Sequence, residues 1–188
     1  MKNKRSGFTI VPIVLLLALY FIFFFPPDKN PPTGIPNNYF DIIEDIEEES
    51  ANVYVYSDTL DFNEDYTPIF ITSIQQVQGG STSPHNFLII DMEKYDTNEF
   101  GTLEQINYLY RERFFHILIV NNKKSNSTFL DDLIDYQDRD SDLITLTFTP
   151  LRDVFYSGSN SGEIPNNQIL MYSILFAINQ VIVEYDSY

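Results

Sequence analysis

Three aspartates at alternate positions form the closest approach to a metal-binding motif in this 188-residue sequence. Asp138, Asp140 and Asp142 have the D-x-D-x-D spacing of a calcium loop, in which oxygen ligands at alternate positions converge on one hard cation. Leu143 and Thr149 stand where such a loop has its glycine and its final glutamate. A calcium site and a solvated acidic loop are therefore both open interpretations of these aspartates.

The two histidines and the absence of cysteine limit nucleophilic and zinc chemistry. His85 lies two residues after Ser83, but the members of a catalytic triad usually come from distant segments of the chain. His116 begins an apolar run, where a residue at the boundary of a strand is the simpler interpretation. A structural zinc site takes four ligands, mostly Cys and His, so this composition argues against one. The sequence predicts no catalytic residue and no cofactor.

Motifs that hold phosphate groups or activate a serine are also missing from the sequence. It contains no G-x-x-x-x-G-K-[ST] and no G-x-G-x-x-G after its first apolar run. The nearest approach to a G-x-S-x-G elbow is Gly158 to Gly162, which has Asn160 in the middle and reads as a loop. Nucleotide binding and serine hydrolase chemistry of these types are therefore not supported.

Apolar runs of strand length alternate with segments of helical periodicity, and these elements must position the polar residues. The predicted strands are 53–56, 86–92, 116–120 and 142–148, and the predicted helices are 38–50, 67–78, 102–114, 128–136 and 166–185. Continuous apolar strands between helices are typical of a parallel sheet that is covered on both faces. The sequence predicts an α/β fold, a three-layer α/β/α sandwich with a mainly parallel, flavodoxin-like or Rossmann-like sheet of about four to five strands.

In such a sheet, ligands bind at the carboxyl ends of the strands. Asp58, Asp91 and Asn121 follow or end the first three predicted strands. We therefore expect these three side chains to be the candidate ligand contacts. The alternative to a non-enzymatic domain is a degenerate ligand-binding or hydrolytic domain that uses Asp58, Asp91 and His85.

The N-terminal residues predict a membrane anchor. Residues 7–25 carry no charge and are nearly all apolar, and as a helix they would span about 28 Å, close to the thickness of the hydrocarbon core of a bilayer. Lys2, Lys4 and Arg5 precede this run, so residues 1–6 should stay in the cytoplasm and the bulk of the chain should lie outside the cell membrane. A cleaved signal peptide is the competing interpretation, but its apolar region would be shorter and followed by small residues.

The segment Lys4-Arg5-Ser6-Gly7-Phe8-Thr9 resembles the processing site of type IV prepilins and pseudopilins. That resemblance implies cleavage after Gly7 and a pilin-like subunit. The chain departs from the family pattern at Pro12, where the family has glutamate, and at Pro26-Pro27, which would stop a helix that continues past the membrane in that family.

Residues 26–37 are rich in proline and predict a semi-extended spacer ahead of an extracytoplasmic α/β domain at 38–188. From Gly7 onward the chain has eight basic residues against 27 acidic ones, a net charge of −19. A domain of that charge repels nucleic acid and anionic head groups. The predicted contacts are therefore the lipid bilayer, through 7–25, and a protein partner in the envelope, with no nucleic acid.

The stretch Phe87 to Val120 resembles uncharacterised membrane-anchored domains related to class I glutamine amidotransferases, which share its strand, loop, helix and I-L-I-V strand. The resemblance implies a flavodoxin-like fold. The amidotransferase nucleophile is a cysteine, and this sequence has none, so the implied relationship is one of fold without that chemistry. The functional hypothesis is a non-enzymatic accessory or interaction module of a bacterial envelope complex.

Overall fold

A computed structural model describes residues 36–62, 64–77, 83, 85–121, 143–151, 153–158 and 167–187. The chain separates into two units, Met1–Pro31 and Pro32–Tyr188, and all the described residues lie in the second. The predicted anchor at 7–25, the prepilin-like segment, most of the spacer and the predicted helix at 128–136 lie outside the described residues.

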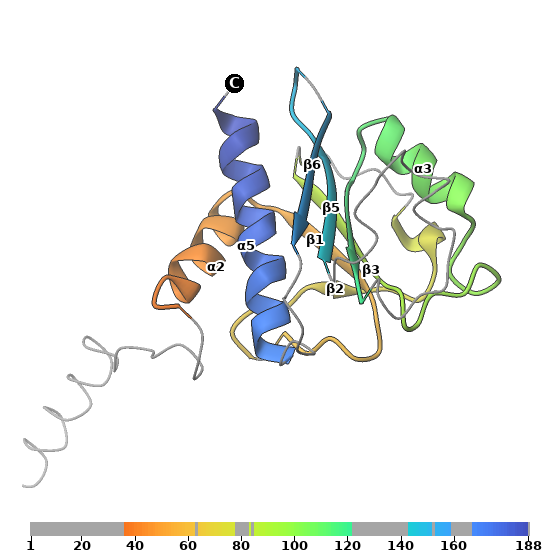
Figure 1. Ribbon diagram of the computed structural model, residues 1–188, viewed down its shortest axis with the longest axis horizontal. Coiled ribbons are helices and arrows are strands. Elements are labelled where there is room, and N and C mark those ends of the chain that lie inside the picture. The colour runs from red at the N-terminus through yellow and green to blue at the C-terminus, as the bar shows by residue number, and fades with distance from the viewer. Residues whose placement is uncertain are drawn as a thin grey trace, which may run out of the picture. The chain divides into compact units, whose positions relative to one another are not determined.

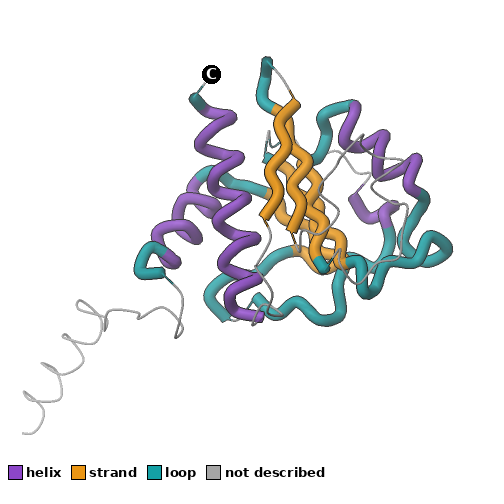
Figure 2. Tube along the Cα trace, viewed as in Figure 1, coloured by secondary structure: helices purple, strands orange, loops and turns teal. Residues whose placement is uncertain are grey.

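The described part of the second unit is a six-stranded sheet with helices on both sides of its strands (Figures 1 and 2). The elements are α2 (Tyr39–Glu48), β1 (Asn52–Tyr56), β2 (Ile69–Phe70), the 3-10 helix η1 (Ile74–Val77), β3 (Asn86–Asp91), α3 (Leu103–Arg111), β4 (His116–Val120), β5 (Leu143–Phe148), β6 (Asp153–Gly158) and α5 (Asn167–Asp186). The α/β class predicted from the alternating patterns is confirmed.

The strands lie in the order β2-β1-β3-β4-β5-β6. β2, β1, β3 and β4 pair in parallel, whereas β5 is antiparallel to both β4 and β6. The sheet is thus mostly parallel, as predicted, but the expectation that 142–148 would join it in parallel is wrong. The end of β5 lies at the turn between α3 and β4, where Arg113 Nη1 donates to Thr149 O at 2.9 Å. The strand therefore runs toward the amino end of β4.

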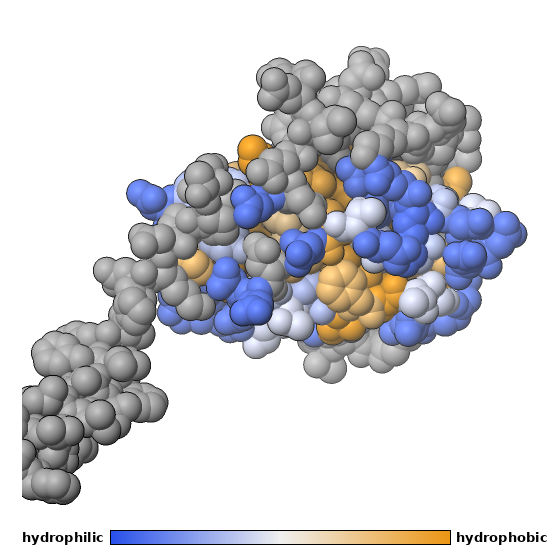
Figure 3. Space-filling model, turned by 90° about the horizontal axis from the view of Figure 1, so that it is seen from below, coloured by the Kyte–Doolittle hydropathy of each residue, from blue (hydrophilic) through white to orange (hydrophobic). Residues whose placement is uncertain are grey.

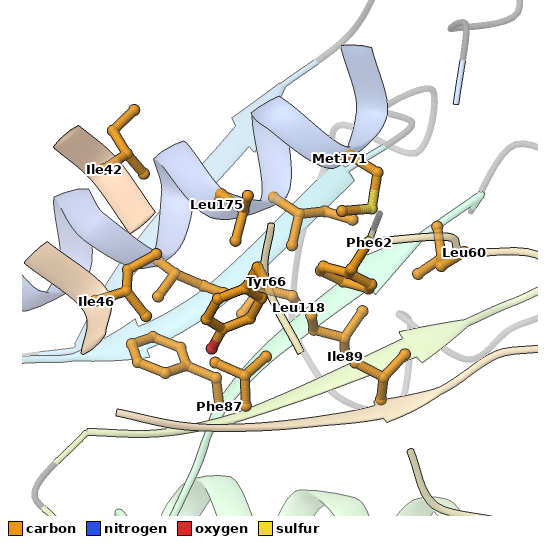
Figure 4. Close-up of a cluster of buried hydrophobic side chains, with 14 of the residues drawn as sticks. Ile42, Ile46, Leu60, Phe62, Tyr66, Phe87, Ile89, Leu118, Met171 and Leu175 are labelled. Carbon is orange, nitrogen blue, oxygen red and sulfur yellow. The ribbon is translucent and has the colours of Figure 1, made fainter. Parts of the chain in front are cut away.

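One face of the sheet is covered by α2 and α5 (Figure 4). The apolar residues of α2 recur at Tyr39, Ile42, Ile43 and Ile46 and are all buried, while its acidic residues are exposed. They form a buried cluster with Met171 and Leu175 of α5 and with strand residues such as Phe87, Ile89 and Leu118. Helical spacing of the apolar residues, with acid on the other side, is sufficient to explain why this segment lies on the sheet.

Two side-chain hydrogen bonds join the ends of the chain within this layer. Tyr172 Oη donates to Asn38 Oδ1 at 3.3 Å, and Asn179 Nδ2 donates to Asp45 Oδ2 at 3.1 Å. The first and last helices of the described chain therefore pack against each other.

The other face of the sheet is covered by α3, η1 and the connecting turns. Tyr56, Leu88, Ile90 and Ile117 of the sheet are buried there against Ile106 of α3. α3 begins with the predicted capping box: the Thr102 hydroxyl accepts from Gln105 N at 3.3 Å, and Gln105 Oε1 accepts from Thr102 N at 2.8 Å. This reciprocal pair satisfies two amides that the first helical turn leaves without a partner.

The helix predicted from Thr67-Pro68 to Gly79 is wrong in its first half. Ile69 and Phe70 form the short strand β2, and Ile71 N then donates to Val55 O at 2.9 Å. A turn follows in which Gln76 Oε1 accepts from Thr72 N at 2.6 Å, and only Ile74–Val77 coils as η1. In residues 69–71, hydrogen bonding to β1 determines the structure, although the apolar residues have helical spacing.

Gln168–Asp186, within α5, is long and apolar enough to cross a membrane, and it is the one such helix in the part of the chain that the structure describes. Its residues Ile174, Leu175 and Ile178 are fully buried within the domain. That packing is typical of a core helix.

Candidate functional site

The carboxyl ends of β1, β3 and β4 bring together polar residues from distant parts of the chain. Ser57 directly follows β1, Asp91 is the last residue of β3, and Asn121 directly follows β4. Parallel pairing places Tyr56 opposite Ile90 and Asp91 opposite Val120, so the three side chains meet at one edge of the sheet. The structure therefore brings together Asp91 and Asn121, two of the three predicted ligand contacts.

Asp91 is the centre of this group, and its side chain is fully buried. Its Oδ2 accepts hydrogen bonds from the hydroxyls of Ser57, at 2.6 Å, and Thr59, at 2.7 Å. Its Oδ1 accepts from Asn121 Nδ2 at 2.8 Å and from the backbone N–H of Glu93 at 3.0 Å. We call this arrangement the Asp91 network.

The Asp91 network uses the whole accepting capacity of the carboxylate. An ionised carboxyl group offers about four lone-pair positions, and four donors occupy them. Hydrogen bonds to a charged acceptor are stronger than those between neutral groups, and they fix the groups that donate them. The four hydrogen bonds therefore join the carboxyl ends of β1, β3 and β4.

The neighbouring residues adopt conformations that serve this network. Asn121 has φ 56°, a left-handed conformation that asparagine tolerates better than most residues and that turns the chain at the end of β4. Ser57 Oγ accepts from the backbone N–H groups of Thr59 and Leu60, each at 3.0 Å, which forms the turn after β1. Each strand end is therefore held both by its own turn and by Asp91.

Asp58 lies beside this network but takes no part in it. Its side chain is 74% exposed and forms an ion pair with Lys94. The Lys94 Nζ atom also lies 4.7 Å from the centre of the Tyr56 ring. Asp58 is thus a surface residue. Its neighbour Ser57 reaches Asp91 instead, because adjacent residues of an extended chain point to opposite sides.

His85 lies at the opposite end of the sheet from Asp91. It directly precedes β3, which Asp91 ends, and six steps of about 3.3 Å place about 20 Å between the two residues. The hypothesis of a hydrolytic centre made of Asp58, Asp91 and His85 therefore fails on geometry. Asp138, Asp140 and Asp142 lie outside the described residues.

His116 is buried in an aromatic stack at the same end of the sheet as His85. Its ring stacks on Phe148, with ring centres 4.2 Å apart, and on Phe87, at 4.9 Å. Its Nδ1 lies 2.5 Å from the Thr147 hydroxyl oxygen. Burial, with a smaller contribution from His85, lowers the pKa of His116 to about 3, so the imidazole is neutral at physiological pH. It is a core residue that packs as an aromatic ring.

No family model, curated protein or solved structure matches this chain. The site is therefore interpreted from its own geometry.

Proposed function

We propose that residues 38–188 form a non-enzymatic interaction domain, held outside the cell membrane by a span at 7–25 and a spacer at 26–37, and that it serves as an accessory part of an envelope complex. The uncharged apolar run, the basic residues before it and the prolines after it support the tether. The net charge of −19 beyond the basic N-terminus favours protein partners over nucleic acid or anionic lipid.

The Asp91 network carries the non-enzymatic part of the proposal. The strand order β2-β1-β3-β4-β5 is that of flavodoxin-like folds, and it supports a relationship of fold with them. In those folds the ligand lies where the strand order reverses, here between β1 and β3. At that place the only carboxylate in the network, Asp91, has its acceptor positions filled by the chain itself.

A small-ligand-binding domain is the second candidate function, and the same strand order favours it. In that case the ligand would contact backbone groups at the ends of β1 and β3, since the Asp91 carboxylate already accepts four hydrogen bonds from the chain itself. Addition of a ligand would then protect the strand ends from hydrogen exchange without displacing Asp91.

A partner surface is supported by exposed apolar side chains at the turn after α3. Tyr108 and Phe114 are 56% and 49% exposed and form an edge-to-face pair with ring centres 6.1 Å apart. Arg113, which directly precedes Phe114, also donates to Pro150 O at 3.4 Å. The next residue after Pro150, Leu151, is exposed. A separate area of apolar side chains lies on the face that Figure 3 shows, which is seen from below the view of Figure 1. Exposed aromatic residues and arginine are the types that protein interfaces favour.

The interaction can be tested by replacing Phe114 with a photo-cross-linking amino acid in the full-length chain in its own cells. We expect a discrete adduct with a protein partner, because Phe114 is exposed and apolar. The matched control is the same amino acid at Glu104, an exposed position near the other end of α3. Adducts that are identical at both positions, or absent from both, would contradict a specific surface here.

The tether can be tested separately because the sequence has no cysteine. In intact cells, a membrane-impermeant maleimide is expected to label the Glu104→Cys variant. The Asn3→Cys variant should be labelled only after the cells are opened, because residues 1–6 are placed in the cytoplasm. Labelling of both variants in intact cells, or of neither, would contradict the proposed orientation.

A further inference from the structure

A cleft of about 340 Å³ lies between the carboxyl-terminal ends of α2 and α5. It is lined by Asp45, Glu48, Glu49, Asn179, Ile182, Val183, Asp186 and Ser187. Four of these residues are acidic and none is basic. The lining therefore has a strongly negative potential, which favours a cation over any other small ligand.

Three potential metal ligands converge beside this cleft. One oxygen each of Glu49 and Asp186 and one imidazole nitrogen of His85 all lie within 4.8 Å of one another. The His85 Nε2 atom is 3.4 Å from Asp186 Oδ1. These residues come from the end of α2, the segment before β3 and the end of α5, so sequence spacing gave no indication of the group.

His85 is a fixed member of the group. Its carbonyl oxygen accepts from Asn52 N at 2.9 Å and its N–H donates to Ser83 Oγ at 3.1 Å, so its backbone is anchored at the start of β3. The edge of its ring contacts the Tyr185 ring, with ring centres 5.2 Å apart. The imidazole is only 2% exposed, and the Asp186 carboxylate lies within ion-pair distance of it.

Buried polar atoms without partners give an independent indication of a ligand. Asn179 lines the cleft and is 8% exposed; its Nδ2 donates to Asp45, but its Oδ1 has no hydrogen-bond partner among the described residues. The same is true of His85 Nδ1. Buried acceptors that remain unpaired are unfavourable, and such groups in a native structure often mark a bound ion or water.

We propose that Glu49, His85 and Asp186 bind one divalent transition-metal ion, with an imidazole nitrogen and two carboxylate oxygens as its protein ligands. The combination of one imidazole and two carboxylates suits Zn²⁺, whereas Mg²⁺ and Ca²⁺ take oxygen ligands almost exclusively. Tetrahedral zinc ligands at about 2.1 Å lie roughly 3.4 Å apart, so the donor atoms that are farthest apart would have to approach each other by up to about 1.4 Å. The side chains of Glu49 and Asp186 are exposed and can make this movement. The ion would join the ends of α2 and α5, a role separate from the proposed partner surface.

The chain's two histidines allow a direct test. Full-length protein in detergent micelles, labelled with ¹⁵N at histidine, is titrated with Zn²⁺ and followed by the imidazole nitrogen resonances. The His85 resonances are expected to show the larger change, at one ion per chain, and Ca²⁺ at the same concentration should leave them in place. Zinc held elsewhere, for example by other acidic residues, would not perturb His85 in this way.

Two variants and a matched control separate coordination from general attraction by negative charge. Glu49→Gln and Asp186→Asn are each expected to raise the Kd for Zn²⁺ by about tenfold or more, because each removes a ligand. Glu48→Gln removes the same charge from the same cleft without removing a ligand, so it should change the Kd by less than about threefold. Both ligand positions are exposed, and far-ultraviolet circular dichroism confirms that the variants are folded. The proposal is overturned if zinc leaves His85 unperturbed, or if Glu48→Gln weakens binding as much as Glu49→Gln does.

Discussion

Replacing Asp91 by alanine is expected to lower the free energy of unfolding by about 3 kcal/mol or more, because each buried donor that loses its acceptor costs about 1 to 3 kcal/mol. The substitution leaves the hydroxyls of Ser57 and Thr59, the amide of Asn121 and the N–H of Glu93 without their common acceptor. A folded domain is stable by only about 5 to 15 kcal/mol in total, so this loss is large. Chemical denaturation of the full-length protein in detergent, followed by far-ultraviolet circular dichroism, measures it.

Two further variants show whether the network is the cause. Asp91→Asn should cost less than Asp91→Ala, because an amide keeps one acceptor oxygen and the Thr59 hydroxyl can rotate to accept from the amide nitrogen. Asp58→Ala should change stability by less than about 1 kcal/mol, since exposed ion pairs contribute little. If Asp91→Ala lowered the free energy of unfolding as little as Asp58→Ala does, the interpretation that Asp91 holds the three strand ends together would be wrong.

His116 is expected to make the domain less stable in mild acid. Its pKa is about 3 in the folded protein against an ordinary value of 6.5, so the unfolded chain binds a proton that the folded chain does not. The contribution of His116 to the free energy of unfolding is therefore fully present well above pH 6.5 and is lost progressively as the pH falls toward 3. Between pH 6.5 and pH 4.5 the loss should be about 2 kcal/mol, because the unfolded histidine is already half protonated at pH 6.5 and the full slope of about 1.36 kcal/mol per pH unit is reached only below it.

The contribution of His116 can be isolated by comparing the protein with its His116→Phe variant at several pH values. Phenylalanine keeps an aromatic ring between Phe87 and Phe148 but cannot be protonated. All other groups titrate in both proteins, so the difference between their free energies of unfolding should change by about 2 kcal/mol over this range. A difference that stays constant with pH would contradict the neutral, buried state of His116.

The sequence predicts the parts of the fold that depend on local patterns. The continuous apolar runs at 86–92 and 116–120 are β3 and β4, and Thr102 with Gln105 caps α3 as expected. The contact between Asp91 and Asn121 follows from the pairing of parallel strands alone. Each of these predictions needs only the residues concerned and a rule of geometry.

The features that were missed depend on contacts between distant segments. The end of β5 contacts Arg113, which lies 36 residues earlier than Thr149, and local patterns do not encode such a contact. The four residues between β5 and β6 are too few for a parallel crossover, so their antiparallel pairing is readable from the sequence once β6 is known. The roles of Ser57 and Thr59 depend on which way a turn points, and apolar periodicity does not encode that.

The packing of α2 against α5 also determines when the domain can fold during its synthesis. Asn38 and Tyr172, which hydrogen-bond across this layer, lie 134 residues apart in the chain. At about 5 to 20 residues per second, a ribosome needs roughly ten seconds or more to add that stretch. Throughout this interval Ile42, Ile43 and Ile46 have no completed layer to pack against. The layer formed by α2 and α5 therefore cannot form before α5 has been synthesised, and a nascent chain that stops before α5 leaves an exposed apolar helix for chaperones and proteases to recognise.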